Sequence, residues 1–554
     1  AATQLVPANE SNDHEDPGSL DHMSEPTLLA LVKQRFMQGS AHTWIGPRVL
    51  LAVKPQQAGG VRSSTTPLSE TQLAAQADAD PTCRPPHPSA AAEAVYRRLC
   101  RSAKPQALVM VGERGAGKSH QFDDIVRYLC RRGSKGSAAL EAALLGSCNA
   151  LAAVGSAPQP ANSCASQFSR LVQVCGRAAL LRRKRPAPHS LACPSRHPPG
   201  THTPLPTLVQ LHFDDATGAL REARLRCFGL NTCRVPLADG QPFRVFSLLL
   251  AAPPRLAGQL HLGNGHGFHY LGTAVGSQSV STGEAAVAKE AEAPAPADRD
   301  VQHPGDGVET AELEAWQQSL AAVGIADQEQ MQLLRALAGI LHVGELKPSR
   351  SPDHSFAHLV EDDASLQVGT SARRVPAPVP AAPAARLCSR GPATVVGAQL
   401  AAQLLELEPA ALAEALTQRT LRAYGDCDFG RYAAPLYPDE AVGARDALAR
   451  AVFSRVFSRI AQQADASLRD PTRPAGANPP PAVASLLDLA GLERGSHVGL
   501  EELCANYCLE KQHHLLLQAV LGARGGARQA SLTAEQQDSQ TILGLFEQVP
   551  LGLL

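Results

Sequence analysis

The stretch GERGAGKS at residues 112–119 constrains what this chain can fold into more than any other stretch. It fits the pattern G-x-x-x-x-G-K-[ST], follows the apolar segment ALVMV, and precedes a segment whose apolar residues recur at helical spacing. Glycines let backbone N–H groups approach phosphate oxygens, and a helix N-terminus favours an anion. The pattern therefore predicts a strand, a phosphate-binding loop and a helix. A glycine-rich turn that matches by coincidence is the alternative, which both flanks disfavour.

The residue types of this loop have distinct expected tasks. Lys118 would pair with the β- and γ-phosphates of a nucleotide, and the Ser119 hydroxyl would bind Mg²⁺. The residues expected to surround the phosphates are Gly112, Glu113, Arg114, Gly115, Ala116, Gly117, Lys118 and Ser119.

A second candidate piece lies far along the chain, in the segment AVASLLDLAGLE. It ends an apolar strand in Asp488, three residues before Gly491. P-loop NTPases hold Mg²⁺ through an Asp at the end of such a strand, and the glycine N–H can face the γ-phosphate. An Asp after an apolar strand is more often only a turn residue, so this signal gains weight only beside the first motif.

The charge balance excludes several classes of protein. The 51 basic and 52 acidic side chains nearly cancel, which predicts no general attraction to nucleic acid or to an anionic membrane. No apolar run approaches the roughly 18–20 residues of a membrane span, and the N-terminal stretch AATQLVPANE has no signal-peptide core. The 13 cysteines form no C-x-x-C pair, which is typical of reduced thiols in the cytoplasm.

Linker-like and periodic segments alternate along the chain. The segments with linker composition are 56–88, 182–206, 276–305 and 370–394. Two helices are predicted around a break near Gly324, two more around Pro409, and one long helix in DEAVGARDALARAVFSRVFSRIAQQA. Strands are predicted in TWIGPRVLLAV, ALVMVG, TLVQLHFDD and AVASLLDLAG. This alternation predicts an α/β fold with a mixed central sheet flanked by many helices.

Together these pieces resemble the head, or motor domain, of a myosin. GERGAGKS is similar to the family's GESGAGKT, and LLDLAGLERGSHVGLEELCANYCLEKQ is similar to its switch II and relay helix. RALAGILHVGEL, LTQRTLRAYGDCDFGRYAAPL, ARDALARAVFSRVFSRI and TILGLFEQVPLGLL follow in the family's order, so the likeness spans nearly the whole chain. The opening looks most like class XV or class VII unconventional myosins. The resemblance implies a P-loop NTPase fold, ATP and Mg²⁺ as ligands, and a cytoskeleton-associated partner of actin.

The resemblance also implies an order of parts. We expect a disordered lead (1–20), then an N-terminal head part with P-loop and switch I (21–181), a Pro-rich basic insertion (182–206) and a transducer-like central-sheet segment (207–275). A linker (276–305), a helical upper subdomain (306–348) and a loop insertion (349–394) follow. The last parts are a helical upper subdomain with an actin-loop-like segment (395–469), a linker (470–482), and switch II with a partial relay helix and the start of a lower subdomain (483–554).

Switch I carries departures from the family pattern. The family's NxNSSRFGK aligns with NSCASQFSR at 162–170. The resemblance implies that Asn162 contacts the nucleotide and that Ser166 keeps a hydroxyl for Mg²⁺. The expected magnesium ligands are therefore Ser119, Ser166 and Asp488.

Two replacements in switch I bear on catalysis. Ala165 stands where the family has a Ser beside the attacking water, and Gln167 stands where an Arg pairs with the switch II glutamate, here Glu493. That ion pair closes the site in the family. Gln167 could donate a neutral hydrogen bond to Glu493, but the charge-assisted pair is lost. Since one preorganised polar contact contributes about 10²–10³ in rate, we expect very slow turnover.

Base recognition and coupling are also altered. Lys54, Pro55 and Arg62 stand where the family has Asn, Pro and Tyr, which predicts poorer discrimination of the base. Gly522, Gly525 and Gly526 interrupt the relay segment at about 1 kcal/mol each, so we expect its helix to end near Leu521. The family's lower actin-binding helices, converter and neck would lie beyond Leu554. The chain is therefore expected to lack a lever arm and light chains, with a partial actin surface at 416–436.

Two functions remain open from the sequence. One is an ATP-binding, actin-associated myosin head with weak or absent hydrolysis, and the other is a non-hydrolysing scaffold, or pseudo-motor. An unrelated P-loop kinase or GTPase fits poorly, because GTPases have no insert as long as that between Ser119 and Asp488, and no NKxD-type motif occurs.

Four weaker signals are interpreted structurally. The run RRKR at 182–185 favours a solvated loop over a nuclear-localisation signal. The histidines of HLGNGHGFHY favour a plain loop over a metal site, and Cys504 and Cys508, on one helix face, favour core thiols over ligands. The near-repeat of RLVQV and TLVQL predicts an extra segment inserted into one strand, or an error in the gene's assigned exons.

Overall fold

The structure is a computed structural model of the chain. It describes residues 25–45, 49–54, 86–102, 106–133, 138–159, 162–176, 212–213, 220–236, 242–263, 268–271, 306–350, 357–360, 396–422, 431–469, 483–492 and 500–522. The chain forms two compact units. The first comprises Ala1–Cys148, Ser166–Gly229 and Ala461–Leu554, and the second comprises Asn149–Ala165 and Leu230–Ile460.

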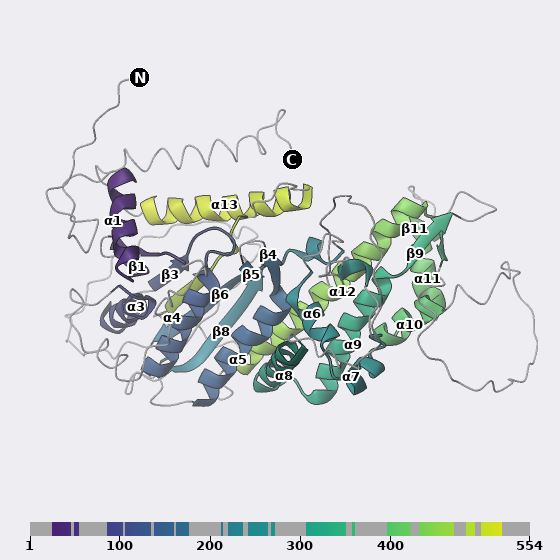
Figure 1. Cartoon of the computed structure of the whole chain (residues 1–554), viewed down its shortest axis with the longest axis horizontal. Helices are drawn as coiled ribbons and strands as arrows, with labels where there is room; N and C mark the ends of the chain where they lie inside the picture. The colour runs from purple at the N-terminus through teal and green to yellow at the C-terminus, as the bar shows by residue number, and fades with distance from the viewer. Residues whose placement is uncertain are drawn as a thin grey trace, which may run out of the picture. The chain divides into compact units, whose positions relative to one another are not determined.

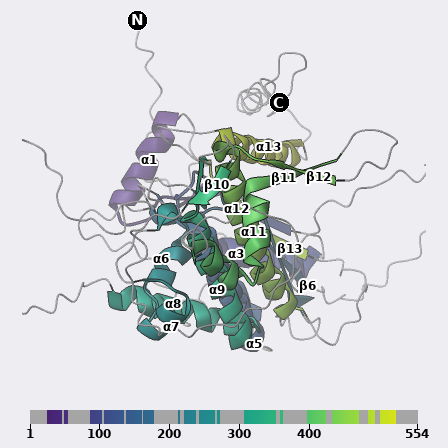
Figure 2. The ribbon, with the colours of Figure 1, turned by 90° about the vertical axis from the view of Figure 1, so that its right-hand side faces the viewer.

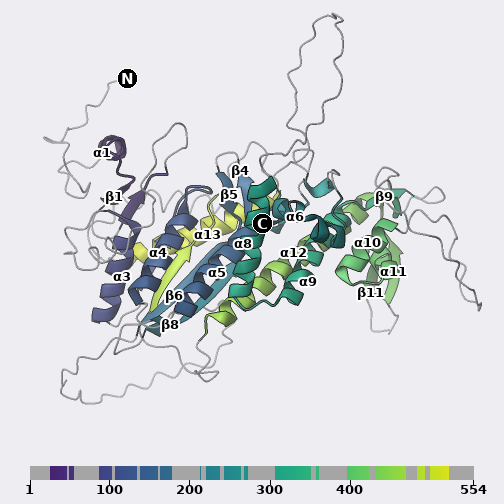
Figure 3. The ribbon, with the colours of Figure 1, turned by 60° about the horizontal axis from the view of Figure 1, so that its bottom comes forward.

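A mixed sheet forms the centre of the first unit. Its strand order is β3-β13-β6-β7-β8, with β6 also paired to β8. The strands are β3 (Gln106–Met110), β6 (Ser169–Gly176), β7 (His212–Phe213), β8 (Leu220–Phe228) and β13 (Val483–Asp488). β13 runs parallel to β3 and antiparallel to β6. β6 and β8 pair with each other and lie side by side in Figure 3. The expected mixed sheet is confirmed.

The register of this sheet gathers residues from distant parts of the chain. Asp488, the last residue of β13, pairs with Met110 on one side and with Arg170 on the other. Met110 stands two positions before Gly112, the first residue of the predicted phosphate loop. The ends of β3, β13 and β6 therefore meet where the loop begins.

Two helices of the first unit pack against β3 and β13. The helices and the small hairpin of this unit are α1 (Glu25–Met37), β1 (His42–Ile45), β2 (Val49–Ala52), α3 (Pro88–Ser102), α4 (Lys118–Gly133) and α13 (Leu500–Gly522). α3 and α4 pack against each other and against β3 and β13 (Figure 1). The predicted apolar face of α4 is buried, with Phe122, Ile125, Val126 and Leu129 at most 3% exposed.

Two of the four boundaries between the units fall within the helices α5 (Ala138–Gly155) and α12 (Pro438–Ser467), and the others follow Ala165 and Gly229. The remaining elements belong to the second unit, apart from Ser166 at the end of β5. They are β4 (Ser156–Gln159), β5 (Asn162–Ser166), η3 (Thr232–Arg234), α6 (Arg244–Leu250), α7 (Pro254–Gln259), η4 (His269–Leu271), α8 (Asp306–Ala322), α9 (Asp327–Gly344), β9 (Lys347–Arg350), β10 (Ala357–Val360), α10 (Val396–Leu405), α11 (Pro409–Thr417), β11 (Gln418–Arg422) and β12 (Arg431–Pro435).

Helix packing holds the second unit together. The Phe453 ring of α12 lies 4.3 Å from Phe243 and 5.7 Å from Phe246, centroid to centroid. Tyr270 is fully buried and donates a 2.7 Å hydrogen bond to Asp446. Figure 2 shows α11 leading into the hairpin of β11 and β12. None of the helices in the described part of the chain is both long and apolar enough to cross a membrane.

Most predicted helices are confirmed. α8 and α9 are separated at Gly324, Pro409 is the first residue of α11, and α12 is one long helix. α13 extends at least to Gly522, the last described residue, so its predicted end near Leu521 stays a prediction.

Two predictions are wrong. TWIGPRVLLAV forms two antiparallel strands, β1 and β2, rather than one. The Gly-Pro pair within it is a common turn signal that the single-strand interpretation passed over. Cys504 and Cys508 are exposed on α13 rather than buried core thiols, because shared helical spacing does not say which face is covered.

The linker-like segments 182–206, 276–305, 370–394 and 470–482 and the run RRKR lie outside the described residues, as does nearly all of 56–88. Of TLVQLHFDD, the structure describes only β7. The predicted insertion between RLVQV and TLVQL therefore stays a prediction.

Candidate phosphate and magnesium site

The predicted phosphate loop connects β3 to α4, as the motif requires. Gly112, Gly115 and Gly117 have φ values of +151°, +83° and +92°, which L side chains rarely adopt. α4 begins at Lys118, so the loop ends at a helix N-terminus. The Lys118 ammonium donates hydrogen bonds to the carbonyl oxygens of Gly112 (2.9 Å) and Glu113 (2.7 Å). The lysine thus folds back over the loop that would hold the phosphates.

Gly491 fixes the backbone of the same loop from the other side. An ideal Cβ built on Gly491 would lie 2.1 Å from the Arg114 amide nitrogen and 2.3 Å from the Glu113 carbonyl carbon. Only a glycine fits such a close approach between two backbones. Nearby, the Ala490 N–H donates a 2.8 Å hydrogen bond to the Ser169 hydroxyl. The segment after β13 is therefore held against both the phosphate loop and the start of β6.

The three predicted magnesium ligands lie together. Ser119 Oγ donates a 2.8 Å hydrogen bond to Asp488 Oδ2 and lies 2.8 Å from Ser166 Oγ. We call Ser119, Ser166 and Asp488 the ligand triad. Its members come from α4, β5 and β13, and 369 positions separate Ser119 from Asp488.

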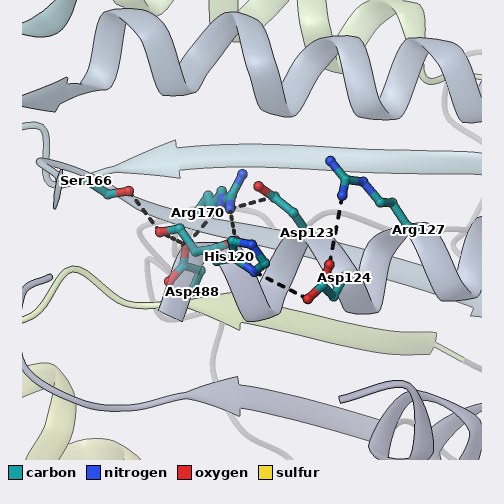
Figure 4. A network of polar contacts seen from close by, with 8 residues as sticks. His120, Asp123, Asp124, Arg127, Ser166, Arg170 and Asp488 are labelled. Carbon is teal, nitrogen blue, oxygen red and sulfur yellow. Dashed lines mark hydrogen bonds and ion pairs between the residues drawn. The ribbon is translucent and has the colours of Figure 1, made fainter. Parts of the chain in front are cut away.

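Arg170 holds the ligand triad in place (Figure 4). Its side chain is buried and donates to Asp488 Oδ2 (3.1 Å) and to the Ser119 carbonyl (3.0 Å). It also forms an ion pair with Asp123 at 2.8 Å, and its guanidinium lies 4.1 Å from the centroid of the Phe122 ring. Desolvation raises the pKa of Asp123, while Arg170 opposes that rise. A single cation thus joins α4, β6 and β13.

The triad has the donor chemistry that Mg²⁺ prefers. Two hydroxyls and one carboxylate are hard oxygen donors, and Mg²⁺ in nucleotide sites is held by one or two carboxylates together with phosphate oxygens and water. Within the described ranges, no three His, Cys, Asp or Glu side chains gather in a way that could hold a metal ion. The two hydroxyls and the lone Asp therefore fit a metal that is shared with a bound phosphate.

The predicted closing residues have a different environment. Gln167 is fully buried between β5 and β6, and its Oε1 accepts a 2.9 Å hydrogen bond from Arg114 Nη1. Ala165 is 2% exposed. Asn162 lies in β5, but its side chain is not described, and Glu493 lies outside the described residues. The predicted contact between Gln167 and Glu493 therefore stays a prediction.

The charges around Lys118 are crowded. Burial lowers the pKa of Lys118 to about 8; Asp488 and Glu113 oppose this change, and the nearby Arg114 charge adds to it. A partly buried ammonium close to a second cation favours binding of an anion. Lys54, from the end of the β1–β2 hairpin, adds a third cation and donates to the Gly115 carbonyl at 3.1 Å.

Sequence reasoning missed Arg170, Asp123 and the partnership of Arg114 with Gln167. The signal for Arg170 was present, because a charged residue within the apolar run FSRLVQV needs a buried partner. Its partner Asp488 is 318 positions away, and only the sheet register brings the two together.

Comparisons with known proteins identify the family of the chain. The family model described as the myosin head (motor domain) matches residues 14–177 and 389–554, more than half of the chain. Similar proteins from Arabidopsis thaliana include Myosin-17, 24% identical over 98% of this chain and 29% of that protein, and Myosin-1, 24% identical over 99% of this chain and 38% of that protein. The chain thus spans less than two fifths of the length of these relatives.

The matched ranges contain the phosphate loop, Ser166, Arg170 and Asp488, the residues that meet at the ends of β3, β6 and β13. The same order of loop, strands and helices was the basis of the resemblance read from the sequence. The chain belongs to the myosin head (motor domain) family.

Proposed function

We propose that this chain is a myosin-type head that binds Mg²⁺ and ATP and cleaves ATP very slowly or not at all. The observation that supports binding is the ligand triad, in which Ser119 Oγ lies 2.8 Å from both Asp488 Oδ2 and Ser166 Oγ. The loop would hold the phosphates through its backbone N–H groups and Lys118. Bound Mg²⁺ would neutralise charge on the β- and γ-phosphates.

The slow cleavage follows from the closing residues. Gln167 carries no charge with which to pair with a switch II carboxylate, and Ala165 has no hydroxyl to position a water. Since one such contact contributes about 10²–10³ in rate, the loss of both leaves a site that holds nucleotide better than it cleaves it. Membership of class XV or class VII remains a prediction.

Binding is tested with fluorescent ATP on the full chain, with and without Mg²⁺. We expect Mg²⁺-dependent binding that Lys118→Ala weakens about tenfold or more, since charge-assisted hydrogen bonds contribute about 1.5–3 kcal/mol. Lys33→Ala, which removes an exposed lysine of α1, is the matched control. If the unchanged chain does not bind fluorescent ATP, or if both variants bind it equally well, the loop does not bind nucleotide phosphates in this chain.

The rival function is a non-hydrolysing scaffold that associates with actin. The hairpin of β11 and β12, which falls within the predicted actin-touching segment 416–436, is the feature that favours an actin partner. Co-sedimentation with actin filaments separates the possibilities. ATP that releases the chain from filaments would support a motor-like head, whereas filament binding insensitive to ATP would support the scaffold.

A further inference from the structure

The phosphate loop carries a second cation whose position is fixed on two sides. Arg114 stands between Gly112 and Gly117, and its backbone is pressed by Gly491, which leaves no room for a Cβ. Its guanidinium donates from Nη1 to Gln167 Oε1 at 2.9 Å. Gln167 is fully buried, so the position of its acceptor oxygen is restricted by the surrounding side chains. Arg114 is therefore a preorganised cation rather than a loose surface side chain.

This cation shares the loop with Lys118. Both residues lie on the eight-residue motif GERGAGKS, so the loop that would hold the phosphates carries two positive side chains. Two neighbouring cations repel each other, and an anion that contacts both relieves the repulsion. Lys118 folds toward the carbonyls of Gly112 and Glu113, whereas Arg114 is tethered to the segment that follows Ser166.

We propose that Arg114 contacts the terminal phosphate of a bound nucleoside triphosphate and that Gln167 positions it there. This inference rests on the proposed nucleotide binding. A guanidinium presents several N–H donors in one plane and suits phosphate oxygens better than an ammonium does. Gln167 then acts through its side-chain oxygen, as an acceptor that aims Arg114, and the cation reaches the phosphate from the loop.

A reciprocal exchange of residues motivates the test. In the motifs quoted above, the family has Ser where this chain has Arg114, and Arg where this chain has Gln167. One cation is present in both arrangements, but it is attached to a different element. A contact with the terminal phosphate must favour a triphosphate over a diphosphate, whereas a purely structural role must not.

The experiment measures the affinities of the full chain for fluorescent ATP and fluorescent ADP in the presence of Mg²⁺. Arg114→Ser is expected to weaken ATP binding about tenfold and ADP binding less than about twofold, as befits a lost charge-assisted contact. Gln167→Ala is expected to weaken ATP selectively by a smaller factor, and it leaves the loop sequence intact in case Arg114→Ser does not fold. The double variant Arg114→Ser, Gln167→Arg is expected to recover the preference for ATP.

Arg131→Ser is the matched control, because Arg131 is 44% exposed near the far end of α4, with Glu141 at 3.8 Å. It is expected to change neither affinity. Equal loss of ATP and ADP binding in Arg114→Ser and Gln167→Ala, or no loss in either, would overturn the proposal while nucleotide binding stands. An unchanged chain that binds neither nucleotide would overturn the proposed function, and this inference with it.

Discussion

Two groups of residues beside the phosphate loop differ in how far they match the myosin motifs: the predicted metal ligands match them closely, and the predicted closing residues do not. On the side predicted to bind the metal, Ser119, Ser166 and Asp488 keep oxygen donors, and Ser119 Oγ lies 2.8 Å from both Ser166 Oγ and Asp488 Oδ2. On the side predicted to close the site, Ala165 and Gln167 stand where the resembling family motif has Ser and Arg, and Gln167 accepts a hydrogen bond from Arg114. We infer from this contrast that binding a nucleotide and cleaving it depend on separate residues of the sequence.

The metal side also has the stronger support from the fold. Arg170 ties the ligand triad to α4, β6 and β13 through Asp488, Asp123 and the Ser119 carbonyl. Removing one partner of a buried ion pair leaves the other charge buried and uncompensated, which strongly destabilises a protein. Replacing a member of this ion-pair network would therefore destabilise the fold. Ala165 and Gln167 are buried and carry no charge, so they need no such partner.

The largest expected effect is on the metal side. Arg170→Gln should lower the free energy of unfolding by about 3–5 kcal/mol at neutral pH, because Asp123 and Asp488 would lose their shared cation. The pKa of Asp123 is already raised, and without Arg170 it would rise further, so the loss should shrink as the pH falls and the carboxyl takes up a proton. Urea unfolding at pH 7 and pH 5 measures this dependence.

Arg131→Gln provides the reference for that experiment, because Arg131 is a partly exposed arginine on α4, the helix that carries Asp123. If both variants unfold at the same urea concentration, Arg170 does not tie the metal side together, and the contrast between the two sides loses its structural basis.

The second largest expected effect concerns the backbone contact between Gly491 and the phosphate loop. Gly491→Ala should destabilise the protein by about 1–3 kcal/mol, since its Cβ would lie 2.1 Å from the Arg114 nitrogen and backbone must shift. Gly443→Ala, in α12 with open space at its Cβ, should instead stabilise by about 0.5–1 kcal/mol. Thermal unfolding of the two variants measures both changes, and opposite signs are the expected result. A neutral Gly491→Ala would contradict the close contact.

The smallest effect concerns the pH dependence of ATP affinity. The pKa of Lys118 is lowered to about 8 in the free protein, and a phosphate would raise it again. Binding then takes up a proton, so the affinity should be constant below pH 8 and fall by up to about tenfold per pH unit above it. Lys118→Arg, which stays charged, should show a flat profile between pH 7 and 9. A flat profile for the unchanged chain would place Lys118 away from the phosphates.

The sequence predicted what depends on local order. The loop glycines, the apolar face of α4 and the break at Gly324 all follow from neighbours a few positions apart. The ligand triad followed from the family pattern, and its residues do lie together. The partners of Arg170 and Arg114 could not be predicted, because pairing across 318 and 53 positions depends on sheet register and on a loop path that no periodicity encodes. The exposure of Cys504 and Cys508 was missed because their shared helical spacing does not say which face of α13 is covered.

The most direct test of the central claim is single-turnover cleavage of ATP by the unchanged chain and by a variant with Arg114→Ser, Ala165→Ser and Gln167→Arg. This variant restores the family's residues on the closing side and leaves the metal side untouched. Both proteins should bind Mg²⁺ and ATP, and the variant should cleave bound ATP about 10²-fold faster or more. Cleavage by the unchanged chain at the rate of the variant would contradict the account, because the closing side would then be intact despite its altered residues.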